Sequence, residues 1–327
     1  MFALVVLAAC SRDAPQNFLH PIGPIAKEQD GLWRLTFGIA AAVFVIVEGL
    51  LVFSIFRFRA RPHGAEPKQT HGNTKAEIAW TIAPVLLLTF VAFPTVSAIF
   101  KLAKEPTDPL QVQVVAHQWW WEYRYEGSGV VTANELHIPV GRPVDLSLES
   151  ADVIHSYWVP KLAGKQDVIP GRVNHLTIQA DEPGVFEGQC AEYCGFSHAN
   201  MRLRVIAETE SDFESWLQSQ KRSARSPTDP LALEGQRLFL EGSFANGQQC
   251  SGCHAINGTT AAGTFGPDLT HLASRTSFAG SMFEMTDDDL VAWLRDPPGR
   301  KPGSQMPNLK LTDSQIQALV AYLNALT

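Results

Sequence analysis

The sequence predicts a multidomain chain with three unlike parts: a two-helix transmembrane hairpin, an all-β sandwich and a mostly α domain. Three observations lead to this prediction: two long apolar runs, then short strand-like runs bounded by turn residues, then segments that open with helix-capping residues. A length of 327 residues exceeds the roughly 150 expected of one domain. The net charge of −7, from 26 basic and 33 acidic side chains, excludes nucleic acid as the principal partner.

Two apolar runs near the N-terminus are each long enough to cross a bilayer. Residues 35–56 carry Glu48 as their only charge and residues 78–100 carry none, whereas about 20 apolar residues suffice for a helical span. We therefore predict two transmembrane helices with a cytoplasmic loop within residues 32–101. The loop holds five basic residues against one acidic residue, so the positive-inside rule assigns both large domains to the periplasmic, outer face.

The first ten residues have the character of a signal segment. Leu7-Ala8-Ala9-Cys10 ends a short apolar stretch and resembles a bacterial lipobox, whose cysteine is lipidated. The stretch has no basic region, so an unmodified stub is the alternative. A lipid on Cys10 would sit on the outer face to which the charge rule assigns this end. We expect a signal or lipobox-like segment over residues 1–10 and a multi-pass protein of the bacterial inner (cell) membrane.

An all-β domain is expected over residues 109–207. Short runs rich in β-branched and aromatic residues are bounded here by Gly, Pro, Asn or Asp, a pattern typical of a sandwich or barrel. The expected strands are residues 112–115, 119–125, 136–140, 144–148 and 172–178.

Helical patterns follow the β domain. A helix over residues 211–220 leads into residues 221–230, whose Lys, Arg, Ser and Pro content is typical of a flexible linker. Residues 231–327 then form a separate, mostly α domain. Its expected helices are residues 231–240, 286–295 and 312–325, the last two opening with a threonine cap followed by aspartate.

The segment between residues 188 and 201 concentrates metal-binding side chains. Cys190, Cys194, His198 and Met201 lie within twelve residues, and His155 lies 35 positions before the first of them. Soft sulfur with imidazole selects copper or zinc. A closed zinc site would leave the thioether without a role, and a single blue copper would leave one thiol unused. Two coppers bridged by both thiolates, each with one histidine and with the thioether and a backbone carbonyl as weak ligands, use every donor. Zinc and a Cys190–Cys194 disulfide remain the alternatives.

Cys250-Ser-Gly-Cys253-His254 is the attachment signature of a covalent c-type haem. Two thioether bonds hold the porphyrin, and His254 ligates the iron. We expect Met306 as the sixth ligand, because it lies in a Pro- and Gly-containing loop just before the last helix, where a thioether can point inward. The other candidates, which we interpret as packing residues, are Met282 and Met285.

Together these motifs resemble cytochrome c oxidase subunit II, up to about Ile206, with a class I cytochrome c domain fused after it. The resemblance implies that the all-β domain is a cupredoxin-like sandwich carrying the dinuclear copper A centre. It implies that the metal ligands are His155, Cys190, Cys194, His198, Met201 and the backbone carbonyl of Glu192.

The resemblance also implies roles for three further side chains. The aromatic run from His117 to Tyr125 matches the family's tryptophan-rich strand, in which Trp119 is where electrons enter. Glu77 matches a residue at the mouth of a proton path into subunit I, although a carboxylate at a helix start is also favoured by the helix dipole alone. The Glu192 side chain would help to bind magnesium at the subunit I interface.

The function that the resemblance implies is electron delivery in a respiratory haem-copper oxidase. A cytochrome c or cytochrome bc complex would donate electrons, which pass through haem c and copper to subunit I for reduction of oxygen to water. Subunits I and III are the expected partners, and the enzyme is the complex, an oxidoreductase and translocase, since this chain has no oxygen-reducing site of its own. The alternatives are a membrane-anchored carrier that serves no oxidase, a nitric oxide reductase complex, and a nitrous oxide reductase, whose copper cluster needs more histidines than the ten present.

Overall fold

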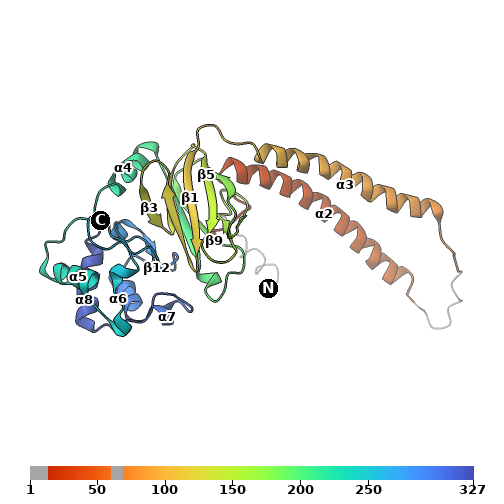
Figure 1. Ribbon diagram of the computed structural model, residues 1–327. Coiled ribbons are helices and arrows are strands. Elements are labelled where there is room, and N and C mark those ends of the chain that lie inside the picture. Colours follow the sequence, from red (N-terminus) through yellow and green to blue (C-terminus); the bar gives the residue numbers. More distant parts are fainter. Residues whose placement is uncertain (1–13, 60–68) are drawn as a thin grey trace. The chain divides into compact units, whose positions relative to one another are not determined.

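The computed structural model describes residues 14–59 and 69–327 (Figure 1). The lipobox-like residues 1–10, and residues 60–68 of the basic link between the two apolar runs, lie outside the described residues. The chain divides into two compact units: Lys27–Glu105 forms one, and the other joins the chain up to Ala26 with Pro106–Thr327.

The first unit is a pair of long apolar helices. Helix α2 spans Pro24–Arg57 and helix α3 spans Thr74–Leu102, so both predicted helices are confirmed. Each is long and apolar enough to cross a membrane, and at most 6% of the most apolar window of either is buried. Side chains so exposed and so apolar suit helices that face lipid or another subunit rather than a core of this chain.

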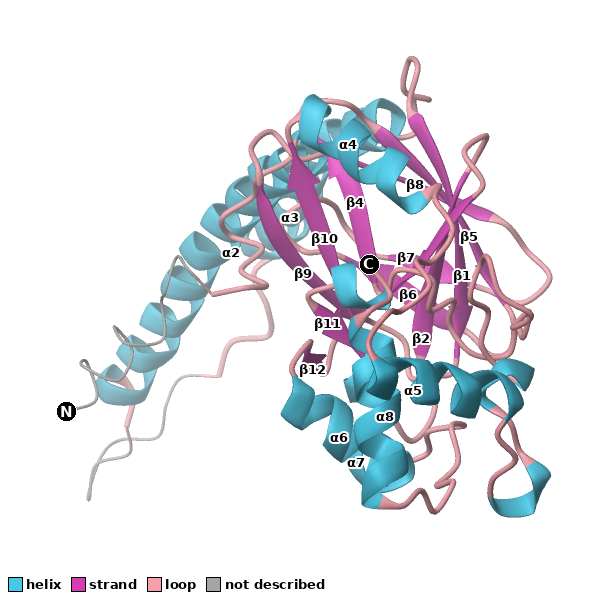
Figure 2. Cartoon of the chain, turned by 90° about the vertical axis from the view of Figure 1, so that its left-hand side faces the viewer, coloured by secondary structure: helices cyan, strands magenta, loops and turns pink. Residues whose placement is uncertain are grey.

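Within residues 106–327, all of which are described, ten strands form two five-stranded sheets that face each other (Figure 2). The first has the order β3-β2-β1-β5-β8 and the second β4-β10-β9-β6-β7. The first contains β1 (Leu110–His117), β2 (Trp120–Tyr125), β3 (Val130–Ala133), β5 (Val144–Ser150) and β8 (Asn174–Ile178). The second contains β4 (Glu135–Pro139), β6 (His155–Trp158), β7 (Gln166–Val168), β9 (Gly184–Cys190) and β10 (Arg202–Glu208).

Alternating burial along the strands builds the core between the sheets. Val112 and Val114 of β1 and Leu146 and Leu148 of β5 are fully buried, as expected for strands with one face inward. The Tyr125 hydroxyl of β2 joins the sheets, because it donates to the carbonyl oxygen of His137 on β4 and accepts from its N–H, each at 2.8 Å. The sandwich predicted from the sequence is thereby confirmed. All five expected strands are present, and β3, β6, β7, β9 and β10 are additional.

The C-terminal part is helical, as predicted. Helix α4 (Glu210–Gln220) buries Phe213 and Leu217 in the core of the sandwich, whereas the later helices surround a core of their own. Those helices are α5 (Pro230–Glu241), α6 (Asp287–Arg295), α7 (Pro297–Arg300) and α8 (Asp313–Asn324), joined by a small sheet of β11 (Ser277–Phe278) and β12 (Phe283–Glu284). Threonine side chains cap α4, α6 and α8 by accepting from backbone N–H groups.

Helices α5 and α8 approach each other closely at Gly235. A methyl group at this position would lie 1.9 Å from the backbone oxygen of Ala318, so only glycine fits between the two backbones. This contact fixes the pair of helices around which the rest of the helical domain is built.

We predict that Gly235→Ala destabilises the helical domain by about 1–3 kcal/mol through overpacking. Helix propensity alone would stabilise the domain by about 1 kcal/mol. The sign of the change in stability therefore distinguishes overpacking from helix propensity. Hydrogen exchange of the α5 and α8 amides measures this domain specifically. Leu233→Ala on the same helix, where the side chain is 46% exposed, is the matched control and should change stability by less than about 0.5 kcal/mol. Stabilisation by Gly235→Ala would contradict the packing described.

Candidate copper and haem sites

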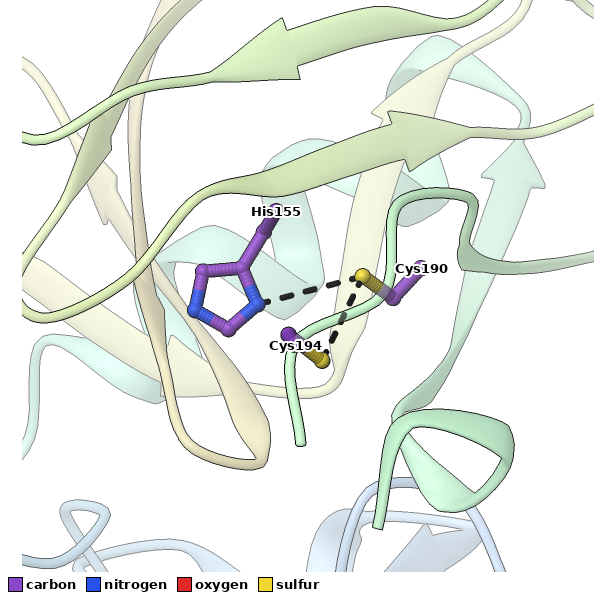
Figure 3. A group of neighbouring side chains, drawn as sticks. All are labelled: His155, Cys190 and Cys194. Carbon is purple, nitrogen blue, oxygen red and sulfur yellow. Dashed lines mark hydrogen bonds between the residues drawn. The ribbon is translucent and has the colours of Figure 1, made fainter. Parts of the chain in front are cut away.

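The six donor atoms expected at the copper site converge at one end of the sandwich. Strands β6 and β9 pair antiparallel with Tyr157 opposite Cys190, which brings His155, at the start of β6, beside the end of β9. Figure 3 shows its ring facing the sulfur atoms of Cys190 and Cys194. His198 and Met201 come from the loop that returns the chain to β10.

Each of the two thiols has two of the other donor atoms beside it. Cys190 Sγ lies 3.8 Å from His155 Nδ1 and 3.2 Å from the backbone oxygen of Glu192. Cys194 Sγ lies 3.6 Å from His198 Nδ1 and 3.9 Å from Met201 Sδ.

The donor set fits a pair of coppers. The two sulfur atoms are 3.8 Å apart and both cysteines are free, so the disulfide alternative is absent from the described structure. Two thiols, two imidazoles, a thioether and a carbonyl exceed what a closed four-coordinate zinc site uses. Soft sulfur and imidazole together are the ligands that copper prefers.

The contact between the two thiols shifts their pKa values in opposite directions. The hydrogen bond from Cys194, together with His155 and nearby backbone groups, lowers the pKa of Cys190 despite its burial. The same contact, together with burial, raises the pKa of Cys194. A thiolate is thus available in a buried site, and metal binding would release the remaining proton.

Asp152 orients the imidazole of His155. One carboxylate oxygen lies 2.8 Å from His155 Nε2, and the other accepts from the Gln118 N–H at 2.6 Å. Burial lowers the pKa of His155, but Asp152 and Cys190 more than offset this effect, so the pKa is raised. A carboxylate on the far nitrogen fixes a histidine ring with its other nitrogen toward a metal.

Trp119 lies against the copper loop. Its Nε1–H donates to the backbone oxygen of Cys194 at 2.9 Å, and Gln118 Nε2 donates to the same oxygen at 2.7 Å. The loop passes close to the indole at Gly195, where a methyl group would lie 3.0 Å from the ring. The residue expected to receive electrons is therefore hydrogen-bonded to the peptide of a copper-ligand candidate.

The four residues expected to bind haem line one cavity of the helical domain. Cys250, Cys253, His254 and Met306 all line it, and so do Trp119 and Trp120 of the sandwich. All three candidate methionines lie in the described part of the chain, and only Met306 lines this cavity; Met282 and Met285 do not.

The His254 ring is held for iron ligation. Its Nδ1 lies 2.8 Å from the backbone oxygen of Pro267, which leaves Nε2 for a metal. Gly266 permits this approach, because a methyl group there would lie 2.6 Å from the ring. Burial lowers the pKa of His254, which favours the neutral imidazole that binds metals.

A buried arginine supplies a second sign that haem fits. Arg275 lines the cavity and is 9% exposed, and its Nε has no hydrogen-bond partner among the described residues. Its Nη2 donates to the backbone oxygen of Asp268 at 2.5 Å. An incompletely paired buried guanidinium matches the negatively charged propionates that haem carries.

Two further glutamates have side chains in different surroundings. Glu77 Oε1 accepts from the Asn73 N–H at 3.1 Å while Asn73 Oδ1 accepts from the Ala76 N–H at 3.2 Å, so Glu77 stabilises the start of α3. The Glu192 side chain is exposed, although its backbone oxygen faces Cys190.

Sequence reasoning assigned no role to Asp152, Arg275 or Lys301. Asp152 could have been found, because an aspartate three residues before a ligand histidine in a turn is within reach of its ring. Arg275 and Lys301 could not have been found, because nothing in the neighbouring sequence distinguishes a buried arginine or lysine from an exposed one.

Comparison with known proteins covers each part of the chain. Residues 12–98 and 128–208 match cytochrome c oxidase subunit II, transmembrane domain and periplasmic domain respectively, and residues 232–327 match cytochrome c. Cytochrome c oxidase subunit 2 of Alkalihalophilus pseudofirmus is 38% identical over 99% of this chain and 95% of its own length. That of Bacillus subtilis is 34% identical over 100% and 96%.

Two further similarities are partial. Quinol oxidase subunit 2 of Bacillus subtilis is 33% identical over 67% of this chain and 70% of its own length. The solved periplasmic domain of subunit II of cytochrome oxidase of Bradyrhizobium japonicum is 30% identical, with a TM-score of 0.35, over 36% of this chain and 96% of that one.

We predict that Asp152→Asn lowers copper affinity about 10- to 100-fold, because His155 loses the group that orients it. Competition with a copper chelator measures the effect. Asp145→Asn is the matched control, since Asp145 also contacts a histidine, the exposed His175, at 3.2 Å. An unchanged affinity in Asp152→Asn, or an equal loss in the control, would contradict the orienting role.

Proposed function

Because the chain belongs to the cytochrome c oxidase subunit II family and ends in a cytochrome c domain, we propose that it receives electrons at a covalent haem c and delivers them through a dinuclear copper centre to subunit I. Reduction of oxygen to water then takes place in subunit I. The haem iron and the copper pair supply one-electron chemistry, and the residues of this chain hold them in place.

The observation that carries the proposal is the position of Trp119. Its indole lines the haem cavity and donates a hydrogen bond to the backbone oxygen of Cys194. The ring is 8% exposed, so water is largely excluded from both of its sides. One buried aromatic side chain therefore spans the interval between the two candidate redox sites.

We assign ligand roles on the geometry described above. The copper pair is held by the thiolates of Cys190 and Cys194, the imidazoles of His155 and His198, the thioether of Met201 and the carbonyl of Glu192. Haem is attached through Cys250 and Cys253 and ligated by His254 and Met306. The convergence of these donors in two separate sites supports the assignment.

The partners and orientation follow from the family and from charge. The chain is membrane-anchored and is part of an oxidase complex. We propose that both large domains lie on the periplasmic face, since the loop between the helices is basic. Subunits I and III would pack on the exposed apolar helices, with Glu77 at the mouth of a proton path and Glu192 on a magnesium ion shared with subunit I.

A cytochrome donor is favoured over a quinol. The quinol oxidase subunit 2 of Bacillus subtilis aligns with this chain over 227 residues, or 67% of it. The three matched regions run from residue 12 to residue 327. An alignment of 227 residues is too short to cover all three of them. The relatives named cytochrome c oxidase subunit 2 align over 99% or more, including the helical domain. A soluble cytochrome c or a cytochrome bc complex is the donor we propose.

Paramagnetic resonance of the purified complex tests the copper assignment. We expect hyperfine splitting from two copper nuclei, because Cys190 and Cys194 would hold both coppers close together and each metal would have one histidine. Cys190→Ser should abolish this signal, whereas Met285→Leu, which also removes one sulfur atom but lines neither site, should leave it intact. A single-copper spectrum, or none, in the unaltered complex would favour a membrane-anchored haem carrier that serves no oxidase.

We predict that Trp119→Leu slows electron transfer from haem to copper roughly tenfold or more, equivalent to about 1.4 kcal/mol in activation free energy. Flash reduction of the haem, followed by the copper absorption band, measures the rate in the whole complex. Trp216→Leu is the matched control, since Trp216 stacks on His137 at 4.1 Å and lines neither site. An unchanged rate in Trp119→Leu would remove the indole from the path.

A further inference from the structure

The helical domain meets the sandwich through a buried polar interface that the electron path alone does not require. Each domain contributes one buried ionisable side chain to it: Glu135 from β4 and Lys301 from the loop after α7. Glu135 is 1% exposed and Lys301 is 4% exposed. Each of the two side chains makes at least one hydrogen bond to the other domain.

Lys301 is fixed by backbone oxygens. Its Nζ donates to Trp119 O at 2.6 Å and to Ala279 O at 2.8 Å, and none of the ion pairs among the described residues includes it. Burial lowers its pKa to about 7, against the smaller opposing effect of Cys194. A buried ammonium without a carboxylate partner costs stability, so its retention points to a specific contact.

Glu135 is satisfied by the helical domain. Its carboxylate oxygens accept from the Thr276 N–H at 3.0 Å, the Thr276 hydroxyl at 2.6 Å and the Ser277 hydroxyl at 2.7 Å. Nearby, Arg204 of β10 makes a two-pronged ion pair with Glu284, with one N–O distance of 3.1 Å. If the domains separated, a carboxylate built into the sandwich would lose these donors.

Two glycines, one between β11 and β12 and one in the loop after Lys301, let the helical domain approach Trp119 closely. A methyl group at Gly303 would lie 2.9 Å from the ring of Trp119, and one at Gly280 would lie 3.1 Å from its backbone oxygen. Gln305 Nε2 donates to Gln118 O at 3.2 Å. The same loop contains Met306, so contacts that fix the loop also fix one wall of the haem cavity relative to Trp119.

We propose that Lys301 is the positioning residue of a built-in docking site, which holds the haem cavity against Trp119 and closes that residue to any other protein donor. The proposal rests on the proposed function, since it requires both redox centres to be present. An outside donor must then deliver its electrons to the helical domain.

Lys301→Met in the complete oxidase tests this role, because methionine keeps the length of the side chain and removes its charge and donors. We expect electron transfer from haem to copper to slow roughly tenfold, with the haem and copper spectra unchanged. In stopped-flow mixing with reduced soluble cytochrome c, copper should be reduced directly in the variant, without prior reduction of the haem of this chain. Loss of packing inside the helical domain would instead alter the haem spectrum.

Lys310→Met is the matched control, since Lys310 lies in the same domain with an exposed side chain, and it should transfer electrons at the unaltered rate. If Lys301→Met fails to fold, Glu135→Gln tests the other end of the interface with the same measurements. Unaltered transfer in the folded variant, with both spectroscopic signals present, overturns the docking proposal alone. Absence of haem c or dinuclear copper from the unaltered complex overturns the proposed function and the docking proposal with it.

Discussion

The Trp119 residue is held from both sides, and the relation between the candidate copper and haem sites depends on this. On one side the indole N–H of Trp119 donates to the backbone oxygen of Cys194. On the other side Gly303 packs against the indole ring, and Lys301 donates to the backbone oxygen of Trp119. The copper loop can be held in this position because the register of β6 and β9 sets Tyr157 opposite Cys190. Trp119 is therefore in contact both with the loop that carries the copper-ligand candidates and with the helical domain.

The polar character of the docking interface has an energetic reason. Buried ionisable groups contribute little net stability, but they penalise every arrangement in which they lose their partners. Glu135 and Lys301 thus select one orientation of the haem cavity. The segment between α4 and α5 adds to this, since Arg222 O accepts from His271 Nε2 at 2.9 Å and the Ala224 N–H donates to Asn257 O at 2.9 Å. A tether attached in this way keeps the local concentration of the haem domain high.

The features that the sequence could predict are those that depend on residues close together in the chain. The haem motif, the donors between residues 190 and 201 and the strands rich in bulky residues depend on near neighbours, and the structure contains them all. Strand β9 was missed because Gly184, Gly188 and Glu187 weaken its strand pattern, and β7 has only three residues. The contact of Lys301 with Trp119 joins positions 182 residues apart, so no window of sequence contains it.

Docking also changes which surface a donor can reach. Residues 227–327 hold ten acidic and six basic side chains, but Arg275 and Lys301 are buried in the haem cavity and in the interface. Glu284 is also used in the interface, where it pairs with Arg204 of the sandwich. Nine acidic side chains then remain against four basic ones, so the rest of the helical domain is more acidic than its composition indicates. Opposite charge accelerates encounter and orients partners. With Trp119 covered, this acidic surface is what a donor would meet, and it favours a donor whose own redox centre lies within a basic face.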